Sequence, residues 1–390
     1  MNILVIGNGF DLAHGLPTKY ADFLLWIVGE YDFFYKLKEQ KAQITDSREG
    51  IFLKMPNGLK GTVISQRVCC QQEVWECIDN NIWVEYFLSI YKDREKVGKN
   101  GWIDFESEIS QVIKSLDDDM NLSISQHLIL DDKIKYITNE FLNCKYIDWF
   151  AKKTYRELRD VLLNDLNRLI RVFEIYLCEY VEKIEIRKKS QSVEELKIDH
   201  VLSFNYTHTF SRLYKIAERI GKSDLAIFDY IHGEAKIENS IESNNMVLGI
   251  DEYLPKDRQN TEIEFIAFKK YYQRIYKETG SKYKEWLDII KKDERELKEK
   301  FKNVYPIQVP FKKCIGKHHN LYIFGHSLDI TDKDILRDLI LNDNIKTTIF
   351  YRNKEELGRK IANLVKIIHQ DELIRRTGGS TKTIYFELQK

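Results

Sequence analysis

Four short polar segments carry the side chains best suited to chemistry, and each one directly follows an apolar run. They are Gly7-Asn8-Gly9, Asn205-Tyr206-Thr207, His232-Gly233-Glu234 and Gly325-His326-Ser327. A histidine beside a water or a ribose hydroxyl is a competent general base, because it titrates near physiological pH. An asparagine amide can hold that water or ribose in place. Asn205 and His232 therefore suit cleavage of an N-glycosidic bond through an oxocarbenium-like transition state. The nicotinamide of NAD fits as leaving group, since it departs without protonation.

The first segment opens a turn that is longer than the usual dinucleotide fingerprint. Gly7 and Gly9 allow a tight turn, and we expect their backbone N–H groups to be open to a phosphate or a ribose. The third glycine of the G-x-G-x-x-G pattern is displaced to Gly15. The longer turn contains Asp11 and His14, two side chains able to do chemistry. The alternative interpretation is that the glycines only form a strand-to-helix turn.

The elements that must position these segments alternate between strand and helix. Strand-like apolar runs occupy residues 2–6, 200–204, 225–231, 246–248, 320–324, 347–351 and 384–386. This pattern predicts an α/β class fold, Rossmann-like and doubly wound, with a mainly parallel sheet and large helical insertions. Ligands of such sheets bind outside the carboxyl ends of the strands. The four polar segments would therefore converge on one crevice if their strands are neighbours.

Each polar segment also has a purely structural interpretation. Asn205 can cap the helix that follows it, and His232 can be an ordinary turn residue. His326-Ser327 can be the start of a helix. The repetition of one design at four strand ends favours a shared site over four separate structural explanations.

Helical periodicity divides the rest of the chain. Thr18 is a candidate N-cap for a helix through Ile27, and residues 36–66 read as a loop or small hairpin. From about 70 to 198, apolar residues recur at spacings of three and four. We expect a Rossmann-like domain over 1–30 and 199–390, a mostly helical insertion domain over 31–198, and a charged, solvent-facing helical insertion at about 256–303.

Composition excludes several classes of protein. Lys and Arg number 61, as do Asp and Glu, and this neutral balance disfavours a general nucleic-acid binder. The six cysteines form no C-x-x-C pair and have no His or Cys counterpart at zinc-ligand spacing, so no metal site is expected. We expect no signal peptide, and no apolar run reaches the roughly 18 residues of a membrane helix. We expect a soluble cytoplasmic protein with no membrane partner.

Five motifs along the chain carry a resemblance to a known family. The resemblance begins with a long motif over residues 3–23, which contains Gly7-Asn8-Gly9-Phe10-Asp11 and His14-Gly15-Leu16-Pro17. It continues through Trp102-Ile103-Asp104-Phe105-Glu106, Ser203-Phe204-Asn205-Tyr206-Thr207, Ile231-His232-Gly233-Glu234 and Phe324-Gly325-His326-Ser327-Leu328. These motifs span nearly the whole chain, and in this order they resemble those of the AbiH proteins, bacterial abortive-infection factors that act against phage.

That family in turn looks like sirtuin-type domains, including NAD-cleaving ones of phage defence. By this resemblance Asn205 and His232 form the catalytic pair. By the same resemblance Gly7, Gly9 and Gly15-Leu16-Pro17 would hold the nucleotide, and Ser327 would touch it. The site that we expect at the strand-end turns also includes Asn8, Phe10, Asp11, His14, Tyr206, Thr207, Gly233, Gly325 and His326. Thr207 replaces an acid of the sirtuin motif, and the four-cysteine zinc ribbon is absent, so protein deacylation is not implied.

Two acids and three functions stay open. In one interpretation Asp104 and Glu106 reach the crevice, where they bind a ribose or stabilise cationic charge. In the other, the apolar residues of this motif pack within the helical insertion and the two acids face solvent. The chain is interpreted first as an effector that hydrolyses NAD or a related nucleotide, with NAD as substrate and not as cofactor. The alternatives are a non-catalytic nucleotide sensor that signals to a partner, and a metal-dependent nuclease that uses Asp11, Asp104 and Glu106. A phage-derived trigger, a homo-oligomer, and a lid or sensor role for the insertion are left open.

Overall fold

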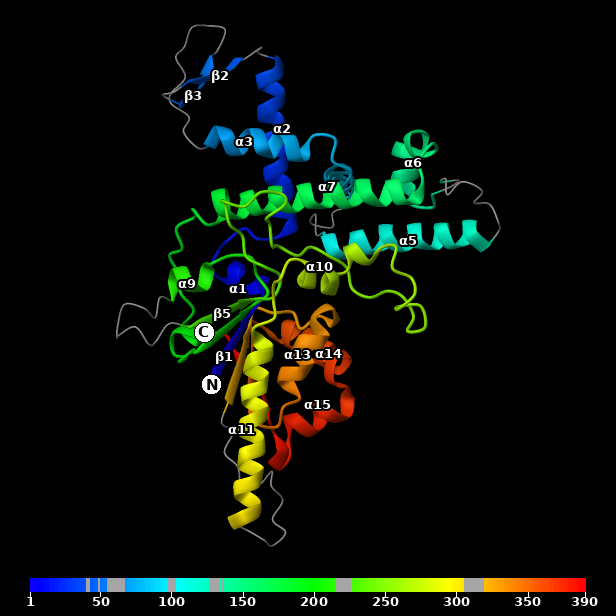
Figure 1. Ribbon diagram of the computed structural model, residues 1–390. Helices are drawn as coiled ribbons and strands as arrows, with labels where there is room; N and C mark the ends of the chain where they lie inside the picture. The colour runs from blue at the N-terminus through cyan, green and yellow to red at the C-terminus, as the bar shows by residue number, and fades with distance from the viewer. Residues whose placement is uncertain are drawn as a thin grey trace. The chain divides into compact units, whose positions relative to one another are not determined.

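The chain folds into two compact units (Figure 1). The structure, a computed structural model, describes residues 1–39, 43–47, 50–54, 67–96, 103–125, 134, 137–214, 226–304 and 319–390. The sheet unit comprises residues 1–17, 182–234 and 278–390. The helical unit comprises residues 18–181 and 235–277. The chain therefore crosses between the units several times, and each unit is assembled from separate stretches of sequence.

The sheet unit is built on a six-stranded, entirely parallel sheet. Its strands are β1 (Asn2–Ile6), β4 (His200–Ser203), β5 (Ile227–Tyr230), β6 (His319–Phe324), β7 (Ile345–Tyr351) and β8 (Ile384–Leu388). Their spatial order is β5-β4-β1-β6-β7-β8, which is the order of the dinucleotide-binding doubly wound fold. In register, Ile6 lies opposite both Ser203 and Phe324, and Ser203 lies opposite Tyr230. The four polar segments therefore leave the sheet at one edge, from four adjacent strands.

Alternation along β1 supplies both faces of this sheet with core residues. Ile3 and Val5 belong to one hydrophobic cluster, whereas Leu4 and Ile6 belong to the other. The first face is covered by α11 (Tyr283–Val304), α13 (Lys333–Ile340), α14 (Lys354–Ile368) and α15 (Gln370–Thr377). The second face is covered by the short helices α1 (Asn8–Ala13), α8 (Gln191–Glu194) and α9 (Thr209–Leu213). Burial of both faces explains why the strands read as nearly continuous apolar runs.

The helical unit contains an aromatic core. Its helices are α2 (Tyr20–Glu39), α3 (Arg67–Ile78), α4 (Ile82–Lys96), α5 (Phe105–Ser125), α6 (Glu140–Phe150), α7 (Tyr155–Tyr176) and α10 (Lys270–Tyr276), with a π-helical turn at Leu177–Val181. The ring of Phe105 stacks between Tyr20 and Phe87, with centroid distances of 4.2 and 4.0 Å. Thr154 and Glu157 form a capping box that begins α7. Strands β2 (Gln43–Ser47) and β3 (Gly50–Lys54) pair as an antiparallel hairpin.

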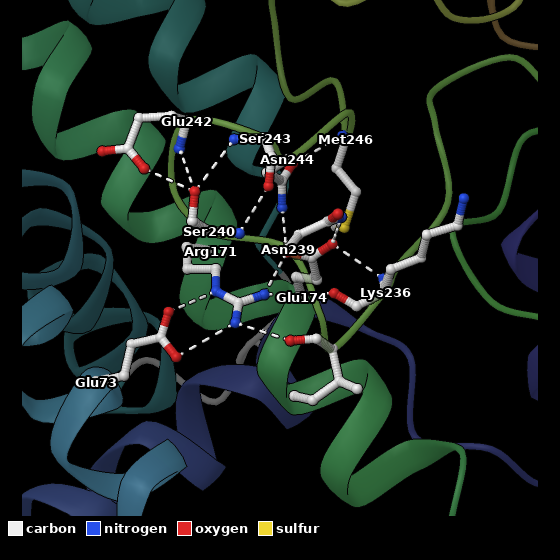
Figure 2. Close-up of polar contacts among 11 residues, drawn as sticks. Glu73, Arg171, Glu174, Lys236, Asn239, Ser240, Glu242, Ser243, Asn244 and Met246 are labelled. Carbon is white, nitrogen blue, oxygen red and sulfur yellow. Dashed lines mark hydrogen bonds and ion pairs between the residues drawn. The ribbon is translucent and has the colours of Figure 1, made fainter.

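A buried ion pair attaches residues 235–246 to α7 (Figure 2). The Glu174 carboxylate is fully buried and accepts hydrogen bonds from the Lys236 backbone N–H and from the side chains of Asn239, Asn244 and Arg171. Arg171 also donates to both carboxylate oxygens of Glu73 on α3. Because every charge in this network has a partner, residues 235–246 are held to the helical unit although they follow β5 directly in sequence.

The structure confirms the predicted α/β class and the parallel, Rossmann-like sheet. The predicted strand over residues 246–248 is wrong. Met246, Val247 and Leu248 are buried in irregular backbone, and only Ile250 forms an isolated bridge, with Lys269. Burial without regular pairing gives the same apolar run as a strand, so the sequence pattern could not separate the two.

Two further expectations are corrected near helix ends. Thr18 does not cap α2, because the carbonyl of Lys19 accepts the first helical bonds, from Asp22 and Phe23. The charged stretch expected at 256–303 is not solvent-facing throughout, since α11 buries Trp286 and Ile290 against the sheet. Within the described ranges, none of the helices is long and apolar enough to cross a membrane.

Candidate functional site

The turns after β1 and β6 pack backbone against backbone. The Gly9 N–H donates to the Gly325 carbonyl oxygen over 2.8 Å. A Cβ at Gly9 would lie 2.6 Å from that oxygen, and one at Gly325, whose φ is +69°, would overlap the amide nitrogen of Phe10. A Cβ at Gly7 would lie 2.9 Å from the Cα of His326. The glycines are thus required by the approach of two turns. The N–H of Gly9 is not open to a ligand, contrary to our expectation.

Side chains join the turns after β1 and β4. The Asn205 amide donates to the Gly7 carbonyl oxygen over 3.0 Å, and Asn205 itself is only 5% exposed. The Thr207 hydroxyl donates to Asp11 over 2.7 Å, and the Thr209 hydroxyl donates to Thr207. The residue that precedes α9 as its N-cap is His208, so Asn205 does not cap that helix. Its amide instead positions the β1 turn.

Asp11 is a buried carboxyl group at the centre of these contacts. Burial raises the pKa of Asp11 to about 6, although the hydrogen bond from Thr207 acts in the opposite direction. Its second oxygen, Oδ1, is buried and accepts no hydrogen bond within the residues that the structure describes. A carboxyl group with this pKa exchanges its proton just below neutral pH.

The turns after β5 and β6 meet at one carboxylate. The Nε2 atoms of His232 and His326 lie 3.3 Å from the two oxygens of Asp332, which follows β6. The ring of Phe204, next to Asn205, packs edge-on against both histidines, with centroid distances of 5.6 and 4.4 Å. All three polar residues are at most 7% exposed. The four strand ends therefore form one connected cluster of side chains.

The backbone around His326 is tightly restrained. The Leu328 N–H donates to Nδ1 of His326 over 2.9 Å, and Leu328 adopts a φ of 60°, which is rare for a non-glycine residue. The ammonium of Lys360, on α14, donates to the carbonyl oxygens of His326 and Phe350. Burial lowers the pKa of Lys360, and the nearby Glu356 carboxylate opposes that shift. Strain at Leu328 is tolerated because these bonds hold the turn on both sides.

A second charged cluster lies beside the β4 and β5 turns. His208 places Nδ1 2.8 Å from Glu182 and Nε2 3.2 Å from Glu234. These two carboxylates, Glu182 first, raise the pKa of His208 to about 9, against the effect of burial. His208 is therefore an imidazolium at neutral pH and cannot act as a base there.

Comparison with known families decides where the chain belongs. The family model described as bacteriophage abortive infection AbiH matches residues 3–351, which include all four strand-end turns. The chain belongs to the AbiH family. No curated protein and no solved structure matches it. Membership assigns this AbiH chain a role in abortive infection against phage. Its likeness to sirtuin-type domains stays a prediction.

Several residues that we expected to contact a nucleotide have structural partners in the AbiH chain. His14 is buried between the Phe10 carbonyl, 2.7 Å from Nδ1, and the Tyr214 hydroxyl, 2.8 Å from Nε2. Tyr214 accepts a hydrogen bond from the Ser190 N–H, so its own proton is directed to His14. Burial lowers the pKa of His14. This neutral histidine has both ring nitrogens occupied.

The other residues that we expected to contact a nucleotide include both buried and exposed ones. Phe10 and Leu16 are buried in the core, and Thr207 and Gly233 are buried at their turns. Asn8, Gly15 and Ser327 are exposed, and Gly9, Pro17, Tyr206 and Gly325 are partly exposed. The exposed or partly exposed polar side chains among these residues at this edge of the AbiH sheet are those of Asn8, Tyr206 and Ser327.

The two expected accessory acids lie in the helical unit and have structural partners there. Asp104 accepts hydrogen bonds from the Glu106 and Ser107 N–H groups at the start of α5. Glu106 pairs with Lys270 of α10 at 2.7 Å. Trp102 lies outside the described residues. Within the part of the chain that is described, no three or more His, Cys, Asp or Glu side chains are grouped to hold a metal ion.

Sequence reasoning missed three members of the AbiH site. Phe204 was recognised only as a member of the motif around Asn205. Lys360 lies in the middle of a helix, where no neighbouring residue indicates a role in a site. Asp332 resembles any acid at a helix start. None of the three can be recognised without the fold, because each also contacts a residue at least 28 positions away: Phe204 and Asp332 contact His232, and Lys360 contacts the carbonyl of His326.

Proposed function

We propose that this AbiH-family chain binds NAD or a related nucleotide at the carboxyl ends of β5, β4, β1 and β6, and hydrolyses its N-glycosidic bond to nicotinamide. The observation that carries the proposal is the meeting of Asn205, His232 and the glycine turn at adjacent strand ends. The strand order reverses between β1 and β6, and doubly wound sheets bind their ligands at such a reversal.

In the proposed reaction the bond between ribose C1′ and the nicotinamide nitrogen breaks, and its electron pair stays on that nitrogen. The positive charge left on the sugar is stabilised as an oxocarbenium ion. The oxygen of a water bonds to C1′, and its proton passes to His232 as general base. Asn205 orients the water or the ribose. The products are ADP-ribose, nicotinamide and one proton.

The buried environment of the cluster supports this assignment of roles. His232 is held among Phe204, His326 and Asp332, so its ring has few alternative orientations. The neighbouring histidines are poorer candidates, because His14 has both nitrogens occupied and His208 is protonated at neutral pH. Depletion of NAD would starve an infected cell and limit phage spread, in keeping with the family's role in abortive infection.

The test is NAD loss and nicotinamide release by the purified full chain. We expect hydrolysis by the wild type and a loss of about 100-fold or more in Asn205→Ala and in His232→Gln. His369→Asn is the matched control, because His369 is an exposed histidine at the end of α14. Melting curves of each variant separate loss of chemistry from loss of folding, since the Asn205 amide also holds the Gly7 carbonyl.

The same assay is repeated in phage-infected cells, where NAD is followed over time. Steady NAD during effective defence would reject the hydrolase. Calorimetric binding of NAD without its consumption would then favour the nucleotide sensor, with Asn205→Ala weakening binding.

A further inference from the structure

Asp332 lies between two histidines that come from different strand ends. Its Oδ1 is 3.3 Å from Nε2 of His232, and its Oδ2 is 3.3 Å from Nε2 of His326. Asp332 is 7% exposed and ends the short helical turn Ile330–Asp332. Oδ1 accepts no hydrogen bond within the described residues, so the His232 contact is a close approach of a ring nitrogen to a carboxylate oxygen and not a formed hydrogen bond.

The ring of His326 has only one tautomer that fits its surroundings. Its Nδ1 accepts the hydrogen bond from the Leu328 N–H, so Nδ1 carries a lone pair. In the neutral ring the proton is then on Nε2, the atom beside Asp332. The lone pair needed for a metal bond or for base catalysis is therefore absent from that nitrogen. Nε2 of His326 therefore presents its proton toward Asp332, 3.3 Å away.

The other oxygen of the carboxylate, Oδ1, faces Nε2 of His232. An ionised carboxylate oxygen presents only lone pairs, and a nitrogen lone pair 3.3 Å away would be repelled by it, so the nitrogen of His232 that faces Asp332 must carry a proton. The lone pair of neutral His232 is then on Nδ1. The orientation of a base by a carboxylate on its far nitrogen is a known requirement of histidine catalysis.

We propose that Asp332 is a positioning residue that keeps His232 in the Nε2-protonated tautomer, with Nδ1 as the atom that takes the proton from water, and that His326 holds Asp332 in place. The catalytic part of this statement rests on the proposed function. The tautomers themselves do not depend on it.

Asp332→Asn tests the proposal, because the Asn side chain has nearly the same size and shape as Asp but replaces one acceptor oxygen with an NH2 donor. The Asn carbonyl can accept from only one histidine, while its NH2 group must face the other. Because the Leu328 N–H keeps His326 protonated on Nε2, the carbonyl faces His326 and the NH2 group faces His232. Nε2 of His232 must then accept, so its proton moves to Nδ1 and the base is lost. Asp329→Asn is the matched control, because Asp329 caps the same turn and is exposed.

The readout is the tautomer of each ring, from nitrogen chemical shifts of the full chain labelled with 15N-histidine at pH 7.5. His232→Gln and His326→Gln assign the two signals. We expect both rings to be Nε2-protonated in the wild type and in Asp329→Asn, and only His232 to switch to the Nδ1-protonated form in Asp332→Asn. A wild-type His232 that is protonated on Nδ1, or doubly protonated, overturns the proposal, as does an unchanged His232 in Asp332→Asn.

Kinetics separate this proposal from the hydrolase itself. If the wild type hydrolyses NAD, kcat should fall about 100-fold or more in Asp332→Asn with KM changed less than about threefold, because the base and not the binding is altered. An equal kcat in Asp332→Asn contradicts the positioning role. If the wild type does not hydrolyse NAD, the proposed function fails, and the tautomers still decide whether Asp332 orients His232.

Discussion

The N–H of Gly9 donates a hydrogen bond to the carbonyl of Gly325, and this bond ties the turn after β1 to the turn after β6. These two strands are neighbours at the point where the strand order reverses, although their turns are more than 300 residues apart. The Asn205 hydrogen bond to Gly7 connects the turn after β4 to the turn after β1, and Asp332 connects His232 after β5 to His326 after β6. Together these contacts connect all four strand ends.

Gly9→Ala should destabilise the chain by about 3 kcal/mol, because the new Cβ would press against the Gly325 carbonyl. Two alanine substitutions serve as controls. Gly15 has a positive φ but no atom within 4 Å of its Cβ position, so Gly15→Ala should cost only about 1 kcal/mol. Gly358 lies open within α14, where Gly358→Ala should stabilise by about 0.5–1 kcal/mol. Urea unfolding midpoints measure all three, and equal losses for Gly9→Ala and Gly15→Ala would refute the close-contact explanation.

Asp11→Asn should remove a pH-dependent cost of folding. Burial raises the pKa of Asp11 from 3.8 to about 6, so the folded chain holds this proton more tightly than the unfolded chain does. The wild type should therefore lose stability as pH rises from about 4 to about 6, by an amount on the order of 2–3 kcal/mol. Asp11→Asn accepts the Thr207 hydrogen bond without a charge and should lack this slope. Unfolding curves between pH 4 and 7.5 compare the two, and parallel pH profiles would contradict the assignment.

His208 should stabilise the fold at neutral pH and stop doing so in alkaline solution. Glu182 and Glu234 raise the pKa of His208 from 6.5 to about 9. A raised histidine pKa gives stability that is complete below about 6.5 and disappears as pH rises through 9. We expect the wild type to lose on the order of 2 kcal/mol relative to His208→Gln between pH 6.5 and 10, after allowance for partial solvent screening. Melting temperatures across this range test it, and a pH-independent difference between the two proteins would rule out the ion cluster as its source.

Glu174→Ala should destabilise the helical unit by about 3–5 kcal/mol, since it leaves the Arg171 guanidinium buried beside unpaired amides. Glu73 is the outer partner of Arg171 and is 35% exposed, so Glu73→Ala should cost about 1 kcal/mol or less. Urea unfolding followed by far-UV circular dichroism compares them. Similar losses in both variants would mean that Glu174 is not the centre of the network.

Local sequence was sufficient for the strands of the sheet and for the position of their turns, but not for the order of the strands. Apolar runs of five to seven residues ending in glycine, asparagine or histidine identify four of the six parallel strands, because strands covered on both faces need no polar side chains until they leave the sheet. The pattern failed at residues 246–248, where buried irregular backbone has the same composition as a strand.

The sequence by itself determined the α/β class and the presence of Asn205, His232 and the glycine turn at strand ends, since each depends on neighbours within a few residues. Only the tertiary structure decided which side chains share partners. In the folded chain His14 lies between Phe10 and Tyr214, and the Gly9 N–H donates to the Gly325 carbonyl. Asp332 lies beside His232, although the two are 100 positions apart in sequence. Pairing of this kind follows from the order of strands in the sheet, which periodicity along one chain does not encode.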